Sequence, residues 1–358
     1  MLRRACSTVF VFSVLALVAA SPAAARVANA YQVTNLVSDQ LGVAPTVDPA
    51  LVNPWGLVAG PTTPWWVADN LTNLSTLYGG AGNKIALEVS VPGGPTGVVF
   101  NGGTGFVVTD GTSSGAARFI FATMAGQIRG WSPAVPSPAP STQTEVGADR
   151  SGVDASYTGL AIASTTGGDR LYAADFHNAR VDVFDSAFGL VTPAGAFEDP
   201  MLPPSYAPFG IQTIGDRIFV AFAKQDADAE EEVPGIGLGF VDAFDTDGSL
   251  LGRVATRGRL NAPWGVAMAP DTFGRFAGDL LVGNFGDGQI NAYHERPDGR
   301  FAHAGRLRMP GGHLIAIDGL WALQFGNDAA AGSSDSLFFT AGPDDETHGL
   351  FGKIDPAG

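Results

Sequence analysis

The sequence has 358 residues, including 48 glycines and 24 prolines, and only 15% of its residues are charged, which is typical of many short strands joined by tight turns. Acidic residues outnumber basic residues by 35 to 20, and the basic residues form no cluster. The composition therefore argues against a nucleic-acid partner, whose phosphates are bound largely through Lys and Arg. The one cysteine, Cys6, lies in the leader described next, so the rest of the chain has no disulfide or thiolate site.

Residues 1–25 are predicted to be a secretory signal peptide. Two arginines precede an apolar run from Val9 to Ala20, and small residues follow it. This run is too short for a stable membrane span, and a second possible cleavage site lies after residue 30. We therefore expect a secreted or periplasmic monomer with no membrane span, in which residues 31–358 form a single domain.

A β-prone run, Tyr31–Val37, precedes the repeats described next and has no unit of its own to join. The last repeat offers only three convincing strands, around 320–325, 336–341 and 349–354. The N-terminal run is therefore predicted to supply the fourth strand of the last unit. This pairing would close a ring and remove two unpaired sheet edges.

The motif Asn53-Pro54-Trp55-Gly56 returns as Ala262-Pro263-Trp264-Gly265 and, more weakly, at four other places. The six copies place their glycines at Gly56, Gly97, Gly159, Gly210, Gly265 and Gly319. These glycines are 41 to 62 residues apart, and strand-like runs fill the intervals. The sequence therefore predicts an all-β fold, a six-bladed β-propeller.

Within each unit, a strand led by the glycine motif is followed by a second strand, a turn and a third strand. In the third unit, Val181 and Val183 alternate with the polar Asp182, so the two kinds of side chain are expected on opposite faces of the strand. In the second unit, Arg118–Thr123 and Gln127–Trp131 are predicted to be the middle strands. Phe106–Asp110 is then interpreted as an extension of the inner strand.

The propeller topology predicts where functional residues gather. The connector that enters each inner strand and the turn between the second and third strands emerge at the same end of the ring, around the mouth of the central channel. The acidic run Asp226–Glu232 and the turn 344–348 both occupy second-to-third-strand connections, so we expect them at this end.

His177 and His348 are the candidate catalytic residues, because they occupy equivalent turns in opposite units and could face each other across the axis. Acidic neighbours suggest a divalent cation (Ca²⁺, Mg²⁺, Mn²⁺ or Zn²⁺) at the same place. The candidate metal ligands are Asp226, Asp228, Asp344, Asp345, Glu346 and His348. The alternatives are that each histidine bonds to a backbone carbonyl and that the acidic run is a solvated loop.

Other polar and aromatic residues at the same end are candidates for binding a substrate. They are Trp55, Asn70, Asp175, Asn178, Lys224, Trp264, Asn284 and His313. The two tryptophans could instead wedge between blades, and Asn70 could cap a turn. The sequence contains no nucleophile elbow, phosphate loop or dinucleotide fingerprint, so no nucleotide cofactor is expected.

Several motifs carry a resemblance to a known family. They are Asn53-Pro54-Trp55-Gly56, Phe119-Ile120-Phe121-Ala122-Thr123, Ala223-Lys224-Gln225-Asp226-Ala227-Asp228 and Glu346-Thr347-His348-Gly349-Leu350-Phe351-Gly352. Over nearly the whole mature chain, the sequence resembles an exported bacterial β-propeller family related to the NHL-repeat type. The resemblance implies the fold and export, and it brings no established activity.

Two classes of function follow from these patterns. In the first, the protein is a metal-dependent hydrolase or lyase whose axial site uses the two histidines and their acidic neighbours. In the second, it is a non-catalytic module that binds a glycan, a peptide or a cell-envelope partner. The expected ligand is accordingly a small molecule, a glycan or a peptide, and the fold alone does not choose between the two classes.

Overall fold

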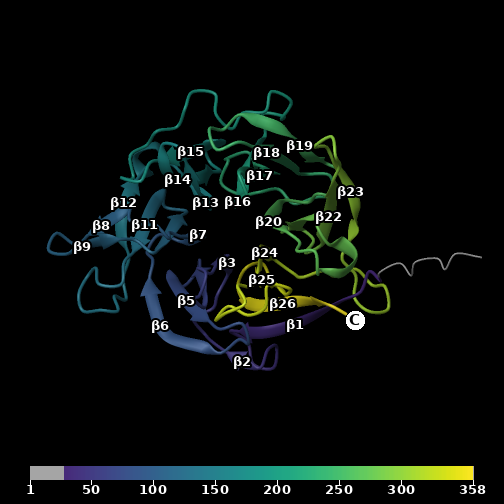
Figure 1. Cartoon of the computed structure of the whole chain (residues 1–358), viewed down its shortest axis with the longest axis horizontal. Helices are drawn as coiled ribbons and strands as arrows, with labels where there is room; N and C mark the ends of the chain where they lie inside the picture. Colours follow the sequence, from purple (N-terminus) through teal and green to yellow (C-terminus); the bar gives the residue numbers. More distant parts are fainter. Residues whose placement is uncertain (1–27, 358) are drawn as a thin grey trace, which may run out of the picture.

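A computed structural model describes residues 28–357, and the predicted signal peptide lies outside these residues. The described chain forms six blades around a central axis, as predicted (Figure 1). The first three blades are β3 (Pro54–Val58), β4 (Trp65–Asp69), β5 (Leu74–Tyr78) and β6 (Lys84–Ser90); β7 (Pro95–Phe100), β10 (Phe119–Thr123), β11 (Gln127–Trp131) and β12 (Glu145–Asp149); and β13 (Tyr157–Thr165), β14 (Gly168–Asp175) and β15 (Arg180–Phe184).

The other three blades complete the ring. They are β16 (Tyr206–Ile214), β17 (Arg217–Lys224), β18 (Phe240–Phe244) and β19 (Leu250–Thr256); β20 (Pro263–Met268), β21 (Leu280–Asn284), β22 (Ile290–Glu295) and β23 (Phe301–Arg306); and β24 (Leu320–Phe325), β25 (Leu337–Ala341), β26 (Leu350–Pro356), β1 (Tyr31–Ser38) and β2 (Thr46–Val47). Two 3₁₀ turns, Ser151–Val153 and Gly274–Phe276, are the helical segments of the described chain, and none of its helices could cross a membrane.

The ring is closed by the N-terminal strand, which confirms the prediction. Strand β1 pairs antiparallel with β26, from Tyr31 opposite Pro356 to Ser38 opposite Leu350. The Tyr31 side chain is fully buried, and its hydroxyl donates a hydrogen bond to the carbonyl of Phe273 in the fifth blade. The first residues of the domain are therefore built into its last two blades.

Close approach between neighbouring blades explains the repeated glycines. A Cβ atom on Gly97 would lie 2.2 Å from the backbone nitrogen of Leu160 in the next blade, and one on Gly210 would lie 2.1 Å from the carbonyl oxygen of Trp264. In the sixth unit the prediction of Gly319 as the motif glycine is wrong. Leu320 occupies the register position of Pro54, so Ala322 is the equivalent of Gly56. Gly319 comes before the strand, at a φ of +63°.

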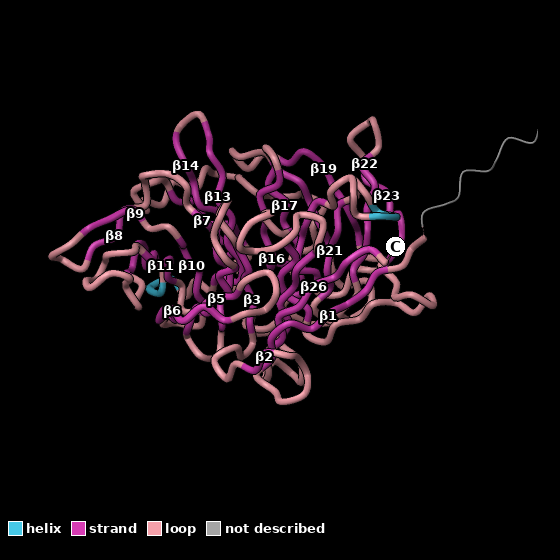
Figure 2. The backbone as a smooth tube through the Cα atoms, turned by 60° about the horizontal axis from the view of Figure 1, so that its bottom comes forward, coloured by secondary structure: helices cyan, strands magenta, loops and turns pink. Residues whose placement is uncertain are grey.

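The second blade departs from the prediction at one place. Its middle strands are the predicted ones, but β8 (Val107–Thr109) does not extend the inner strand. It pairs with β9 (Ser114–Ala116) in a separate hairpin, which projects from the body of the ring in Figure 2. In the third blade, Val181, Asp182 and Val183 alternate as expected, yet all three are buried, because neighbouring structure covers both faces of the blade.

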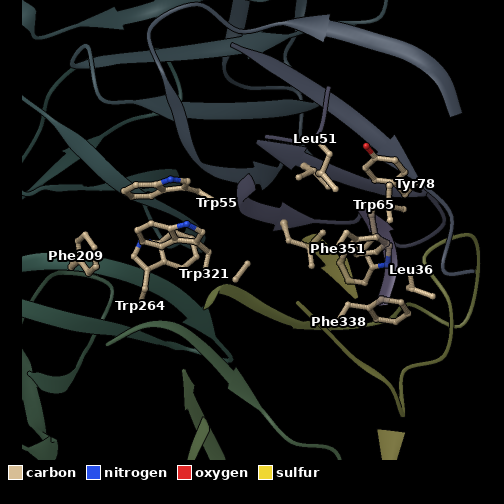
Figure 3. Packing of buried hydrophobic residues seen from close by; sticks show 14 of the residues in the cluster. Leu36, Leu51, Trp55, Trp65, Tyr78, Phe209, Trp264, Trp321, Phe338 and Phe351 are labelled. Atoms are coloured by element: carbon tan, nitrogen blue, oxygen red, sulfur yellow. The ribbon is translucent and has the colours of Figure 1, made fainter. Parts of the chain in front are cut away.

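Aromatic side chains fill the centre of the ring. Trp55, Trp264 and Trp321 come from three inner strands and pack together with Phe209 of a fourth (Figure 3). The rings of Trp55 and Trp321 stack with centroids 3.6 Å apart, and the indole nitrogen of Trp264 donates to the carbonyl of Thr158 at 2.9 Å. We call these four residues the aromatic plug, since they divide the two ends of the channel.

Candidate functional site

The connectors and turns meet at one end of the ring, which we call the loop end. The backbone nitrogen of Asn70, in a second-to-third-strand turn, donates to the carbonyl of Asn53 in the connector of the same blade. The same pairing joins Phe285 to Ala262 in the fifth blade. The turn 344–348 lies at this end, as predicted, because Glu346 accepts a hydrogen bond from Asn53 in the connector of the first blade. The run Asp226–Glu232 lies there too, because Ala229 contacts His177 in the turn of the third blade.

The turn at 344–346 has an unusual backbone. Asp344, Asp345 and Glu346 have φ angles of 58°, 51° and 66°, so three successive residues with side chains adopt the left-handed conformation. Each such residue costs roughly 1–3 kcal/mol, and such costs concentrate at functional sites. The turn thereby holds Glu346 where its carboxylate accepts a hydrogen bond from the amide of Asn53 at 2.6 Å.

Three glutamates at the loop end are hard to ionise. Burial raises the pKa of Glu232 to about 8, and the charges of Glu346 and Glu231 add to this effect. Burial also raises the pKa of Glu346, although the hydrogen bond from Asn53 opposes the shift. The pKa of Glu231 is raised by burial and by the neighbouring Asp226 and Glu230. A carboxyl with a raised pKa can hold a proton near neutral pH, which is what a general acid needs.

His348 does not share a site with His177. Its Nδ1 lies 2.7 Å from Oδ2 of Asp39, whose other oxygen accepts a hydrogen bond from the backbone nitrogen of Gly349. Asp39 follows β1, the strand outside β26 in the sixth blade. His348 is therefore paired on the outer side of its turn, and the predicted pair of histidines across the axis does not form.

His177 borders an open cleft of about 510 Å³ at the loop end. Four segments line it: the turn between β10 and β11, the connector into the third blade, the His177 turn and the acidic run of the fourth blade. The lining residues are Met124, Ala125, Ser151, Asp154, Ala155, Ser156, His177, Ala229, Glu230 and Glu231. We call this space the His177 cleft.

The acidic run is fastened to the His177 turn. Nδ1 of His177 lies 3.2 Å from the carbonyl oxygen of Ala229, and the amide of Gln225 donates to the carbonyl of Phe176 at 2.6 Å. Since a carbonyl oxygen can only accept, Nδ1 must carry the proton in this contact. The neutral imidazole then keeps Nε2 as a free acceptor. The sequence alternative, in which the histidine bonds to a carbonyl, thus accounts for one ring nitrogen only.

Several predicted binding residues are part of the framework. Trp55 and Trp264 are 4% and 9% exposed and belong to the aromatic plug, which favours the packing interpretation over ligand stacking. Four other predicted binding residues form hydrogen bonds to nearby backbone or to nearby side chains. Asn70 donates to the carbonyl of Pro95, Asp175 accepts from the Ser156 backbone and from the Asn178 amide, and Asn284 donates to the Arg259 carbonyl and to Asp287.

The other predicted residues are dispersed over the loop end. Asp228, Asp344, Asp345 and His313 are exposed, and within residues 28–357 their side chains make no hydrogen bond. Asp226 caps its own run by accepting from the backbone of Glu230, and Lys224 forms no ion pair with any described residue. No three His, Cys, Asp or Glu side chains of the described chain are placed to hold a metal ion. A divalent cation at these residues stays a prediction.

Sequence reasoning missed the residues that surround the histidine and the glutamates. Asn53 belongs to the first motif, and its side chain contacts Glu346 and Trp321. Met124, Asp154 and Ser156 lie in connections of the second and third units and carry no motif. Asp39 is 309 residues from His348, and no local pattern connects them. The turn topology could have suggested Met124 and Ser156, since it brings those segments to the loop end.

Two of the solved structures similar to this one are enzymes with a β-propeller fold. A streptogramin B lyase matches with a TM-score of 0.52 and 11% identity over 91% of this chain and 98% of that one. A glucose dehydrogenase matches with a TM-score of 0.53 and 14% identity over 91% of this chain and 100% of that one. These likenesses establish the fold.

Sequence comparison identifies relatives in a virus. No protein-family model matches the chain. The uncharacterized protein R648 of Acanthamoeba polyphaga mimivirus is 33% identical over 342 residues, which cover 92% of this chain and 81% of the relative. The uncharacterized protein L690 of the same virus is 32% identical over 92% of this chain and 87% of the relative. These viral relatives do not support the bacterial origin implied by the motifs. The chain belongs to the family of the mimivirus proteins R648 and L690.

Proposed function

We propose that the protein is an enzyme, a hydrolase or lyase, and that the His177 cleft is its active site. The observation that carries the proposal is the hydrogen bond between Nδ1 of His177 and the carbonyl of Ala229. It fixes the tautomer in which Nε2 can take a proton, in a cleft that also contains Glu230 and Glu231. A base and a carboxyl with a raised pKa in one cleft are the minimum set for proton transfer at two atoms.

The two residues would divide the proton transfers between them. In an elimination, Nε2 of His177 accepts the proton of a C–H bond beside a carbonyl, the bond between the adjacent carbon and its leaving oxygen breaks, and protonated Glu231 donates to that oxygen. In a hydrolysis, Nε2 accepts a proton from the attacking water, and Glu231 protonates the leaving group. Burial and the charges of Asp226 and Glu230 raise the pKa of Glu231, which is the direction that this role requires.

The charge of the cleft indicates a class of substrate. Asp154, Glu230 and Glu231 line it, and its lining among the described residues includes no Lys or Arg. An anionic substrate would be repelled at close range, whereas a neutral or cationic one would not. We therefore expect neutral or cationic small molecules. The signal peptide predicted at residues 1–25 supports action outside the cytoplasm, which makes an exported enzyme part of the proposal.

The two proton transfers use His177 and Glu231 and do not pass through a metal ion. A divalent cation at the exposed acidic residues stays a prediction, tested by metal analysis of protein purified without chelator. Treatment with EDTA then separates the two versions of the proposal. Activity that survives EDTA supports proton transfer by His177 and Glu231 without a metal, and activity lost with EDTA and restored by a divalent cation supports the metal-dependent version.

Substitution of His177 tests the proposal directly. The amide nitrogen of His177→Asn can replace Nδ1 in the bond to Ala229, but the variant has no base at the position of Nε2. Screened against neutral and cationic esters, lactones and elimination substrates, it should lose about 10²–10⁴-fold in kcat/KM without a change in melting temperature. His313→Gln, at an exposed histidine that does not line the cleft, is the matched control and should keep full activity. An active His177→Asn variant would exclude His177 as the base.

The alternative is a binding module without catalysis. It would be supported if no substrate were turned over while a small molecule, glycan or peptide bound to the wild type and not to Glu231→Gln or His177→Asn. Glycan stacking has the weaker support, because the tryptophans predicted for it are buried in the aromatic plug.

A further inference from the structure

The channel opens at the end opposite the loop end, and we call this opening the channel mouth. The inner strands run away from the loop end, so their last residues surround it. Two adjoining cavities of about 250 and 200 Å³ lie there, and both are lined by Gln212 and Gln324. The remaining lining is largely apolar: Val58, Ala59, Val98, Val99, Phe100, Ala161, Ile162, Thr213, Ile214, Val266, Ala267, Met268, Leu323 and Phe325.

The aromatic plug forms the inner boundary of this space. A small cavity of about 20 Å³, lined in part by Trp264, Gln212 and Gln324, lies between the plug and the channel mouth. It has room for about one water molecule. Each larger cavity exceeds the roughly 150 Å³ that holds a benzene ring in an engineered protein core. The channel mouth is therefore a blind pocket, wide enough for a ring and closed toward the loop end.

Polar groups without partners face this pocket. Within the described chain, the side-chain amides of Gln212 and Gln324 make no hydrogen bond to protein. Both glutamines are half-buried, so their amides are free to donate to and accept from a molecule in the pocket. No Asp, Glu, Lys, Arg or His lines either cavity.

We propose that the channel mouth is a second binding site, for an uncharged small molecule that carries a carbonyl, amide or hydroxyl group. Apolar side chains with a few polar groups among them are the usual composition of small-molecule sites. The absence of charge in the lining disfavours an ionic ligand, since its desolvation would not be offset. Gln212 and Gln324 supply both donors and acceptors, so they would orient the ligand through its polar group.

The site can be tested with two fluorescent probes, independently of any activity in the His177 cleft. Nile red is neutral and carries a ring carbonyl, and diphenylhexatriene is a pure hydrocarbon. The purified protein should bind Nile red at one saturable site, and the affinity should not change between about 50 mM and about 500 mM NaCl, because no charge is involved. Failure to bind Nile red saturably would overturn the proposal.

Two variants locate the bound probe. Ala59→Trp places a large side chain in the pocket from a half-buried position and should weaken Nile red binding at least tenfold. The double variant Gln212→Leu/Gln324→Leu keeps the volume and removes the amides. It should lower the Nile red affinity about 3- to 10-fold and leave the diphenylhexatriene affinity equal or higher. His177→Asn, at the other end, is the control and should change neither. Unchanged binding to Ala59→Trp would place the probe elsewhere and overturn the proposal.

Discussion

The two ends of the ring use the same six inner strands in opposite ways. At the loop end, the run Asp226–Glu232 and the turn 344–348 are rich in carboxylates, and three successive residues of that turn have a left-handed backbone. At the channel mouth, residues after the glycine are apolar and lie in regular strands, with two glutamines as the main polar groups. Chemistry that needs charge and strain is thus confined to loops, while the strand ends offer only shape and neutral hydrogen bonds.

The aromatic plug lies between two regions that differ in their titratable groups. Glu232 and Glu346 have raised pKa values at one end, and no group that titrates near neutral pH lines the other. Binding at the channel mouth should therefore not depend on pH near neutrality, whereas chemistry at the loop end should. Both ends depend on the same closed ring of blades.

Removal of β1 should have the largest effect, because it should unfold the ring and with it both ends. A chain that starts after Ser38 loses the outer partner of β26 and the buried Tyr31, so both ends should lose their support. We expect aggregated or unfolded protein by gel filtration and circular dichroism. Gln32→Ala, an exposed position on the same strand, is the control and should melt like the wild type. A monomeric truncated protein with an unchanged melting temperature would contradict the role of β1 in closure.

Removal of one aromatic side chain from the plug should destabilise the centre of the ring. Trp321 is fully buried, stacks on Trp55 and donates to Asn53 at 3.0 Å. We expect Trp321→Ala to lower the free energy of unfolding by about 3–5 kcal/mol, as large-to-small aromatic substitutions in cores do. Urea denaturation measures the loss. Trp321→Phe, which keeps an aromatic ring, should lose less, and equal losses in the two variants would mean that ring packing does not hold the plug.

The fold could be predicted because its signals are local and repeated. A glycine is needed wherever the next blade comes too close for a Cβ atom, as at Gly97 and Gly210, and strand alternation follows from the pleat. The sixth unit was misaligned because Ala322 replaces the glycine there, while Gly319 nearby offered a false match. Local patterns therefore establish the number of blades more reliably than the register of each.

The site could be predicted only as far as topology determines it. The acidic run and the turn 344–348 were assigned to the correct end, because strand order alone decides which loops share an end. The partners of the histidines were not predicted: Ala229 bonds through its backbone, and Asp39 lies in a distant part of the chain. Burial of Trp55 depends on residues from three other blades, so its motif could not distinguish packing from ligand binding.

Removal of the titratable group at Glu232 should change how the stability of the protein depends on pH. Burial raises its pKa from 4.5 to about 8, so between these values the folded protein keeps a proton that the unfolded chain has released. The free energy of unfolding should therefore fall as pH rises through this window. Glu232→Gln removes the penalty and should be more stable than the wild type at pH 9, by roughly 1–2 kcal/mol after allowance for its partial exposure, and equal to it near pH 4.5. Thermal melts across pH measure the difference. Parallel pH curves for the two proteins would show that this carboxyl is not the one that titrates.

The smallest effect should come from relief of backbone strain at the loop end. Asp345 is exposed, has a φ of 51° and makes no side-chain hydrogen bond within the described chain. Glycine adopts this conformation without steric cost, so Asp345→Gly should raise the free energy of unfolding by up to about 1 kcal/mol. Asp228→Gly is the matched control, because Asp228 is also exposed but has an ordinary φ, and glycine there should be neutral or slightly destabilising. Urea denaturation of the two variants should give changes of opposite sign. If both variants lose stability equally, the left-handed turn stores no strain, and its conformation is simply the one that its backbone hydrogen bonds prefer.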